Sequence, residues 1–362
     1  MKILQIINSF NSGGAEKLLL ETIPLYMQEG VQVDLLLLDG TDSPFLKELK
    51  VKNCCTIYSL GSKSVYNPIH IFKIIPFLKK YDIVHSHLFP SQYWVVLAKI
   101  ISFSKVKILV TEHNTKSPRI EKYFFSKIDK FFYQFYDKVI CISEEVFSII
   151  SQHTKLTEDK YSIIENGVDL NEIYNAKPYV KSEISSLIAE NDILLIHVAR
   201  FTKQKDQQTV IRAMKYLPSN VKLIFVGQGI LENSCKSLVE DLDLNNKVIF
   251  LGSRMDVEKL LVTADISILS TNWEGLSLTA IESMASGKPF VASEVSGITN
   301  LVKDSGILFE KGNEKDLALK IQKLLDDQDL YAKTVEACKR KVKQYDIKFM
   351  IDKHINLYKT II

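Results

Sequence analysis

The sequence predicts an α/β protein with two Rossmann-like domains, each a doubly wound parallel sheet, that face each other across a cleft. Short apolar segments recur without the polar alternation of a half-exposed strand, as is typical of parallel strands covered by helices on both faces. Longer amphipathic segments separate most of them, as βαβ units require. The series occurs twice in 362 residues, a length that exceeds the usual single core.

The first half of the chain predicts six strands that alternate with helical segments. These strands are Ile3–Ile7, Val33–Leu38, Ile83–His85, Ile108–Thr111, Val139–Ile142 and Ile163–Ile164. Each is short and apolar enough to lie inside a sheet that is covered on both faces.

The second half repeats this pattern. Its predicted strands are Leu194–Val198, Val221–Val226, Val248–Leu251, Ile266–Leu269, Phe290–Ala292 and Ile307–Phe309. The helices between them include Asp206–Tyr216, Val257–Ala264 and Lys315–Asp326. In open sheets of this kind, ligands bind at the carboxyl ends of the strands.

A polar stretch over 171–190, which contains Pro178, indicates the boundary between the two halves. We expect an N-terminal domain over 1–172, a C-terminal domain over 173–343 and a final segment over 344–362. The final segment has the apolar face of an amphipathic helix.

Composition limits the class of function. The formal net charge is only +3, so a nucleic-acid partner is not expected. The five cysteines show no zinc spacing and no disulfide framework. No apolar run reaches the ~18 residues that span a bilayer, and the N-terminus lacks the cleavage site of a signal peptide. We therefore expect a cytoplasmic protein.

The segment Glu274–Ser293, EGLSLTAIESMASGKPFVAS, is the strongest candidate site. It follows a predicted strand and places Gly275 where a helix begins. A helix that opens on a glycine turn offers backbone amides to an anion, and the candidates here are Leu276, Ser277 and Leu278. Carboxylates at Glu274 and Glu282 can accept hydrogen bonds from hydroxyls. Phosphate and polyol recognition together indicate a sugar nucleotide as the ligand.

A second candidate cluster follows the strand Leu194–Val198. Arg200 and Lys205 stand at its carboxyl end, where a planar guanidinium and a mobile ammonium suit a diphosphate. Lys203 lies in the same loop, so two solvated surface cations are the alternative.

These motifs resemble those of retaining glycosyltransferases of the GT-B fold, in the large group 1 (family 4) type that includes many bacterial polysaccharide enzymes. The resemblance covers the layout of the whole chain, and its specific motifs lie mostly in the second half. It implies that a sugar passes from a nucleotide-diphosphate sugar to a saccharide or lipid-linked acceptor with retention of configuration. It also implies capsule or lipopolysaccharide synthesis, no metal or other cofactor, and a final helix that crosses back to the first domain.

The resemblance assigns roles to the second-half residues. Glu274 contacts the donor sugar, Glu282 the ribose hydroxyls, and Arg200 with Lys205 the diphosphate leaving group. Gly227 lies in a loop beside the nucleotide, and Arg254 near the base, although a tight turn and a surface charge are the alternatives.

The first half contributes two further motifs. Gly13 and Gly14, in NSFNSGGAE, resemble the family's glycine loop near the donor phosphates. His113 follows a strand and matches the family's cleft histidine, whereas a purely structural role is its alternative. For His85 and His87 we favour a structural or acceptor-side role and no metal site.

The sequence departs from the family at three positions. Ala199 and Asp206 replace glycines that flank the Arg200–Lys205 loop, and Asn300 replaces the usual acid of a later loop. The resemblance places a contact with the sugar or the loop at this acid, so the replacement bears on that contact, while Glu274 and Glu282 are retained.

The segment Lys116–Lys138 interleaves six basic residues with aromatic ones. This pattern suits a helix that lies on a membrane surface, and it equally suits a helix whose aromatics pack on the sheet. Peripheral contact with the inner face of the membrane is therefore one expectation.

Two other functions fit the same motifs. A sugar-nucleotide epimerase of this fold would need acid–base residues around the sugar, and His113 is the one good candidate. A noncatalytic partner that binds a nucleotide sugar is the other. An acid at Asp39 gives only faint support to a dehydrogenase.

Overall fold

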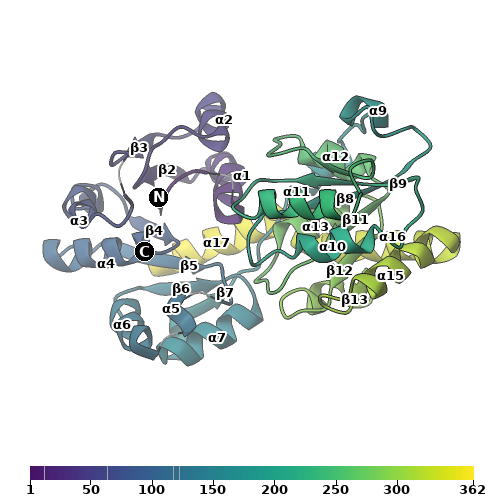
Figure 1. Ribbon diagram of the computed structural model, residues 1–362. Coiled ribbons are helices and arrows are strands. Elements are labelled where there is room, and N and C mark those ends of the chain that lie inside the picture. Colours follow the sequence, from purple (N-terminus) through teal and green to yellow (C-terminus); the bar gives the residue numbers. More distant parts are fainter. Residues whose placement is uncertain (12, 63, 117, 122) are drawn as a thin grey trace. The chain divides into compact units, whose positions relative to one another are not determined.

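The computed structural model describes residues 1–11, 13–62, 64–116, 118–121 and 123–362 (Figure 1). Contacts divide the chain into two compact units. The first unit comprises Met1–Gly167 together with Ile347–Ile362, and the second unit comprises Val168–Asp346. Boundaries at 172/173 and 343/344 were expected from the sequence, a few residues from these.

The first unit contains a seven-stranded parallel sheet in its described residues, in the order β3-β2-β1-β4-β5-β6-β7. Its strands are β1 (Lys2–Ile7), β2 (Gln32–Leu37), β3 (Ile57–Ser59), β4 (Ile83–His87), β5 (Lys107–Glu112), β6 (Lys138–Cys141) and β7 (Tyr161–Ile163). The order reverses between β1 and β4, which is where doubly wound sheets bind ligands.

Helices follow most of these strands. They are α1 (Gly14–Gln28), α2 (Pro44–Lys52), α3 (Ile69–Ile74), α4 (Ser91–Ser102), α5 (Pro118–Glu121), α6 (Tyr123–Tyr133) and α7 (Glu144–Thr154), with 3₁₀ turns at Phe77–Lys79 and Glu158–Lys160. Ser43 and Ser143 cap α2 and α7, since their hydroxyls accept hydrogen bonds from Leu46 and Val146 amides.

The second unit contains a six-stranded parallel sheet in the order β10-β9-β8-β11-β12-β13. Its strands are β8 (Ile193–Val198), β9 (Val221–Val226), β10 (Val248–Phe250), β11 (Ile266–Leu269), β12 (Phe290–Ser293) and β13 (Ile307–Phe309). The order reverses between β8 and β11, so both units share one strand arrangement.

The helices of the second unit are again placed between strands. They are α8 (Leu170–Tyr174), α9 (Lys181–Ile184), α10 (Gln207–Ala213), α11 (Glu232–Asp241), α12 (Val257–Thr263), α13 (Leu278–Ala285), α14 (Thr299–Val302), α15 (Glu314–Asp326) and α16 (Gln328–Val342), before a 3₁₀ turn at Lys343–Tyr345. The polar stretch 171–190 thus carries α8 and α9.

Alternate residues of the second sheet enter two separate apolar clusters. Leu195 and Leu223 belong to one cluster, while Leu194 and Ile224 belong to the other. Because successive side chains of a strand point to opposite faces, these are the two faces of the sheet. Burial on both faces explains the continuous apolar runs of the sequence.

The last helix, α17 (Ile347–Ile361), belongs to the first unit and packs against α1. The hydroxyl of Tyr26 on α1 lies 2.6 Å from Nδ1 of His354 on α17. In Figure 1, this helix is coloured yellow because it comes last in the sequence, although the rest of its unit is purple to teal.

The predicted fold class is confirmed, and most strands lie within two residues of their predicted positions. The prediction missed β3, in which Ile57 and Tyr58 are partly buried and Ser59 is exposed, so the strand carries little apolar signal. The predicted helix over 206–216 is shorter in the structure, where Asp206 caps α10 by accepting from the amide of Thr209. Among the described residues, no helix has the length and apolar character needed to cross a bilayer.

Candidate functional site

Glu274 lies at the carboxyl end of the second sheet, shortly after β11, and its side chain is buried. Lys205, Thr271 and Gln204 contact its carboxylate. Its Oε1 forms an ion pair with Nζ of Lys205 and accepts a hydrogen bond of 2.8 Å from Oγ1 of Thr271. Its Oε2 lies 3.3 Å from Nε2 of Gln204. The structure therefore brings together two residues that were predicted separately, Lys205 and Glu274.

Backbone pairing explains why the Lys205 loop meets Glu274. The amide of Asn272 donates to the carbonyl of Gln204 at 2.7 Å, and the amide of Asp206 donates to the carbonyl of Ser270 at 3.0 Å. Lys205 and Thr271 thus face each other in an isolated antiparallel bridge. The loop after β8 is fixed to the loop after β11, and the ion pair is built on that contact.

Helix α13 begins beside this ion pair. Ser277 is its N-cap, since its hydroxyl accepts from the amide of Ala280 at 3.3 Å. Leu276 and Leu278 are buried, and Glu282 is buried one turn into the helix. The first amides of a helix have no intrahelical acceptor, so the start of α13 is electropositive next to Gly275.

The loop at Gly297 lies directly on the backbone of Glu274. Gly297 has a φ of +83°, and a Cβ built there would lie 2.3 Å from the carbonyl oxygen of Glu274 and 2.6 Å from that of Gly275. Only glycine fits this approach. Asn300 follows on α14 and is exposed.

Arg200 is held by the glycine loop after β9. Gly227 has a φ of +134°, and its Cβ would lie 2.2 Å from the carbonyl oxygen of Ala199, while a Cβ at Gly229 would lie 2.4 Å from that of Phe201. The amide of Phe201 also donates to the carbonyl of Gln228 at 3.1 Å. The Arg200 side chain is exposed, and it forms no ion pair with any described residue.

Arg254 follows β10 and is engaged by its own neighbours. Its Nε and Nη2 lie 2.8 and 2.5 Å from the two carboxylate oxygens of Asp256, which also accepts from the hydroxyl of Tyr179. The hydrogen bond from Arg254 lowers the pKa of Asp256. If Arg254 contacts the base of a nucleotide, its guanidinium has to bind the base and the Asp256 carboxylate at the same time.

In the first unit, Gly13 is the N-cap of α1 and has an extended backbone, while Gly14 is the first residue of that helix. A Cβ at Gly13 would meet only the flexible side chain of Glu16, and a Cβ at Gly14 would meet nothing within 4 Å. Ser12, in the same predicted loop, lies outside the described residues. Unlike Gly227, these glycines are not required by local crowding.

His113 follows β5, and its Nε2 lies 3.2 Å from Nδ1 of His87. Burial lowers the pKa of His113 to about 4, so the ring is neutral at pH 7. His85 and His87 are fully engaged in hydrogen bonds with side chains of the first unit. In the described part of the chain, no three His, Cys, Asp or Glu residues are grouped as metal ligands.

The segment 116–138 is partly packed and partly exposed. Arg119 lies between the buried carboxylates of Glu112 and Asp129, at 2.9 and 2.8 Å. Burial opposes the charge of Arg119, but these two carboxylates raise its pKa. Phe124 and Phe131 on α6 are 71% and 50% exposed. Ser117 and Lys122 of this segment lie outside the described residues.

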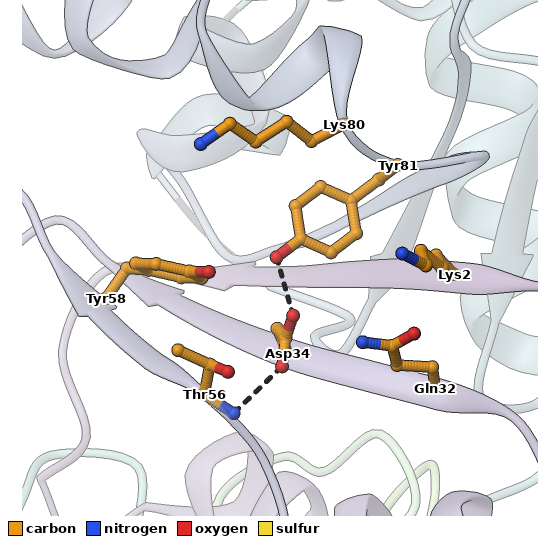
Figure 2. A pocket seen from close by; sticks show the side chains of 7 residues that line it. All are labelled: Lys2, Gln32, Asp34, Thr56, Tyr58, Lys80 and Tyr81. Atoms are coloured by element: carbon orange, nitrogen blue, oxygen red, sulfur yellow. Dashed lines mark hydrogen bonds between the residues drawn. The ribbon is translucent and has the colours of Figure 1, made fainter.

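A pocket of about 370 Å³ lies at the amino ends of the strands of the first sheet, opposite to the end where His113 lies (Figure 2). Its lining residues are Lys2, Gln32, Asp34, Thr56, Tyr58, Lys80 and Tyr81. Several of these start or precede strands, so the pocket is at the amino ends, whereas His113 follows the carboxyl end of β5. Asp34 is already satisfied there by the hydroxyl of Tyr81 and the amide of Thr56. We therefore do not assign the candidate site to this pocket.

Three residues beside Glu274 were missed from the sequence: Gln204, Thr271 and Gly297. A fourth missed residue is Gln5 on β1, whose Oε1 lies 2.8 Å from Nε2 of His87. Gln204 and Thr271 are polar residues just beyond strands, a position that could have identified them. Gly297 lies in the loop that carries Asn300, but its close approach depends on tertiary structure. Gln5 lies within a predicted apolar strand, where a polar residue was itself an unused signal.

Two parallel sheets with this strand order, each covered by helices, define an α/β protein with two Rossmann-like units. Solved structures have the same GT-B fold. HepE of Anabaena, crystallised with UDP and glucose, has a TM-score of 0.86 at 21% identity, over 99% of each chain. Sucrose-phosphate synthase of Thermosynechococcus elongatus has a TM-score of 0.80 at 19% identity, over 100% of this chain and 99% of that one.

Two family models match the chain in tandem. The model described as Glycosyltransferase Family 4 matches residues 12–172, and the model described as Glycosyl transferases group 1 matches residues 181–341. The chain therefore belongs to the group 1 glycosyltransferases of the GT-B fold, and the recognition made from Glu274–Ser293 and the Arg200 loop is confirmed at that level.

Three curated relatives illustrate the range of this family. One is the N-acetylgalactosamine-N,N'-diacetylbacillosaminyl-diphospho-undecaprenol 4-alpha-N-acetylgalactosaminyltransferase of Campylobacter jejuni, 27% identical over 94% of each chain. Another is the UDP-Gal:alpha-D-GlcNAc-diphosphoundecaprenol alpha-1,3-galactosyltransferase of Escherichia coli, 28% identical over 82% of this chain and 79% of that one. The third is the N-acetyl-alpha-D-glucosaminyl L-malate synthase of Bacillus anthracis, 27% identical over 77% and 74%.

Proposed function

We propose that this glycosyltransferase moves a sugar from a nucleotide-diphosphate sugar to a saccharide or lipid-linked acceptor, with retention of configuration, in cell-surface polysaccharide synthesis. One observation carries the donor assignment. At the carboxyl edge of the second sheet, Lys205 and Glu274 form a buried pair beside the start of α13. This pair combines a cation for phosphate with a carboxylate for hydroxyls.

Arg200 and Lys205 are proposed to hold the diphosphate. When the bond between the sugar and the terminal phosphate breaks, the electron pair stays on that phosphate. Fixed cations and the first amides of α13, near Ser277, stabilise the developing charge without having to reorganise. Lys205 is well suited because Thr271 and Glu274 fix its position before any ligand arrives.

Glu274 is proposed to contact the donor sugar, and Glu282 the ribose. Positive charge that develops on the sugar ring is stabilised by the Glu274 carboxylate, whose orientation is set by Thr271 and Gln204. His113 is proposed to bind a sugar hydroxyl from the first unit. The transfer itself needs no metal in this proposal.

A lipid-linked acceptor is supported by the names of two relatives, which act on undecaprenol-linked sugars. Phe124 and Phe131 are exposed on α6, which also carries Lys127 and Lys130. Aromatic and basic side chains on one helix suit the headgroup region of a membrane. We propose that α6 touches the inner face of the membrane where such an acceptor is presented.

The test begins with calorimetry and product detection against UDP, GDP, ADP and their common sugars, each with and without EDTA. One nucleotide class should bind, and its sugar should be turned over equally with EDTA. Arg200→Ala and Glu282→Gln should lose binding, whereas Arg212→Ala, which lies on α10 and bonds to Gln208, should retain it. Absence of binding by every nucleotide would contradict the donor site.

The product distinguishes the remaining functions. Proton NMR of the new glycoside should show the anomeric configuration of the donor, and inversion would refute retention. Conversion of the donor to its epimer without an acceptor would favour an epimerase. Binding without any turnover, over a panel of saccharide, undecaprenyl-linked and small-acid acceptors, would favour a noncatalytic partner.

A further inference from the structure

One face of the first sheet carries a continuous row of polar side chains. Gln5 on β1 is in register with His85 on β4, and His87 is in register with Thr111 on β5. Because alternate residues share a face, His113, two residues beyond Thr111, continues the row. These side chains form one hydrogen-bonded layer that leads from the middle of the sheet to its carboxyl edge.

The contact between Gln5 and His87 determines which ring nitrogen of His87 carries the hydrogen. Nε2 of His87 lies 2.8 Å from Oε1 of Gln5. An amide oxygen only accepts hydrogen bonds, so the hydrogen must be on Nε2 of His87. Burial lowers the pKa of His87 well below its usual range, and the nearby His85 and His113 add to this effect. The ring is therefore neutral, and its Nδ1 carries a lone pair.

The contact between His87 and His113 then determines which nitrogen of His113 carries the hydrogen. Nδ1 of His87 lies 3.2 Å from Nε2 of His113. Since Nδ1 of His87 accepts, Nε2 of His113 must donate, and the neutral His113 ring then has its lone pair on Nδ1. Nδ1 of His113 has no hydrogen-bond partner among the described residues.

The orientation of Gln5 is itself set by α17. Nε2 of Gln5 lies 3.5 Å from the hydroxyl oxygen of Tyr358, which lies 2.8 Å from Nδ1 of His85. Nε2 of His85 completes the chain with Oγ1 of Thr111 at 2.7 Å. Tyr358 therefore accepts from the amide of Gln5 and turns the oxygen of Gln5 toward His87.

We propose that Gln5 and His87 are positioning residues that lock His113 as the Nε2–H tautomer, so that its Nδ1 accepts a hydrogen bond from a hydroxyl of the bound sugar. Only the identity of this sugar ligand rests on the proposed function. The lock on the tautomer depends on the first unit alone. The opposite tautomer would present N–H to the sugar and would favour a different hydroxyl orientation.

Long-range ¹H–¹⁵N NMR of the whole chain, labelled at histidine nitrogen, reads the tautomer directly. The sequence has seven histidines, and His113→Asn assigns the signal in question. At pH 7, the wild-type signal should show a protonated Nε2 and a bare Nδ1 for His113. A protonated Nδ1 in the wild-type protein, or an average of both forms, would overturn the proposal; His113→Asn serves only to assign the signal.

Two substitutions in the same polar layer distinguish a specific effect of the hydrogen bonds Gln5–His87–His113 (the relay) from a general effect of packing. Gln5→Met removes the acceptor of His87, and it should turn His113 into a mixture of tautomers. Thr111→Val removes the partner of His85 only, so it should leave the His113 signal unchanged. A change of the His113 tautomer in Thr111→Val, or none in Gln5→Met, would contradict the relay.

Kinetics tests the link with the sugar. Gln5→Met should lower kcat roughly 10-fold with the nucleotide affinity unchanged, by analogy with residues that orient metal-bound histidines. Thr111→Val should retain wild-type kcat. A shifted tautomer with unchanged kcat would refute acceptance of a sugar hydroxyl by Nδ1. A wild-type protein that turns over no nucleotide sugar would instead contradict the proposed function, and the tautomer measurement would still stand.

Discussion

The two sheets share one strand order but hold their candidate residues in different ways. In the first unit, His113 is held by side chains that run across the buried face of the sheet, through His87 and Gln5. In the second unit, Glu274 and Lys205 lie in loops that are fixed by backbone pairing and by close glycine contacts. The same topology brings residues to the carboxyl ends of the strands in both units, whereas the local sequence decides which contacts hold them there.

Acidification should give the largest effect, because it acts on one unit more than on the other. The first unit contains His85, His87 and His354, which are buried, and His113, which is partly buried; desolvation is the main cause that lowers all four pKa values, to about 4 for His113 and about 3 for His354. In its described residues, the second unit has one such histidine, His197, at about 4.

Because these rings stay neutral when folded, the unfolded chain gains protons first as pH falls below 6.5. Above pH 6.5 the rings are neutral in both states and do not reduce the free energy of unfolding. Between pH 6.5 and about 4, protons bind the unfolded chain more strongly than the folded one, so the free energy of unfolding falls. Each neutral ring costs up to ~1.4 kcal/mol of stability per pH unit in this range. We expect the first unit to lose several kcal/mol by pH 5 and the second unit much less.

The two tryptophans report this difference, since Trp94 belongs to the first unit and Trp273 to the second. Urea unfolding followed in Trp94→Phe and Trp273→Phe variants should show the first unit unfolding at lower urea at pH 5 than at pH 7. Equal shifts for both tryptophans would mean that the histidine layer does not control acid stability.

Loss of the Glu274 carboxylate should give the next largest effect. Glu274→Gln keeps the shape but removes the charge that faces Lys205 and the proposed sugar. We expect kcat to fall by about 10²–10³-fold, as when one preorganised electrostatic group is removed from an active site. Glu336→Gln, an exposed acid on α16, is the matched control and should leave kcat unchanged. Retained activity in Glu274→Gln would remove this residue from the site.

The glycine loops of the two units should respond differently to alanine. Gly227→Ala adds a Cβ 2.2 Å from a carbonyl oxygen at a φ of +134°, so it should destabilise the second unit by roughly 1–3 kcal/mol and weaken donor binding through Arg200. Gly14→Ala meets nothing within 4 Å at the start of a helix, and it should change stability by less than about 1 kcal/mol. Thermal unfolding and calorimetry measure both quantities. A larger loss of stability in Gly14→Ala than in Gly227→Ala would contradict this expected difference between the two glycine loops.

Sequence periodicity was sufficient for the fold because both sheets are buried on both faces. Segments such as Val221–Val226 and Ile266–Leu269 coincide with strands. The short β3 was missed because partly buried strands carry a weak pattern.

The candidate site was only partly predictable, because spacing along the chain does not reveal which loops meet. Lys205 and Glu274 are 69 residues apart, and their pairing depends on the antiparallel bridge between two loops. Gly297 could be identified only from the backbone that it touches. For Arg254, the charge predicted a ligand contact, but the sequence did not show that Asp256, two residues later, already engages it.

The placement of α17 has a consequence for the order in which the protein is made. Residues 347–361 leave the ribosome only after the whole second unit, yet Tyr358 and His354 cover the polar layer of the first unit. Domains ordinarily fold one after another during synthesis. Here, the first unit is translated first but can be completed only last. The second unit is therefore expected to fold while Gln5, His85 and Tyr26 still lack their hydrogen-bond partners on α17.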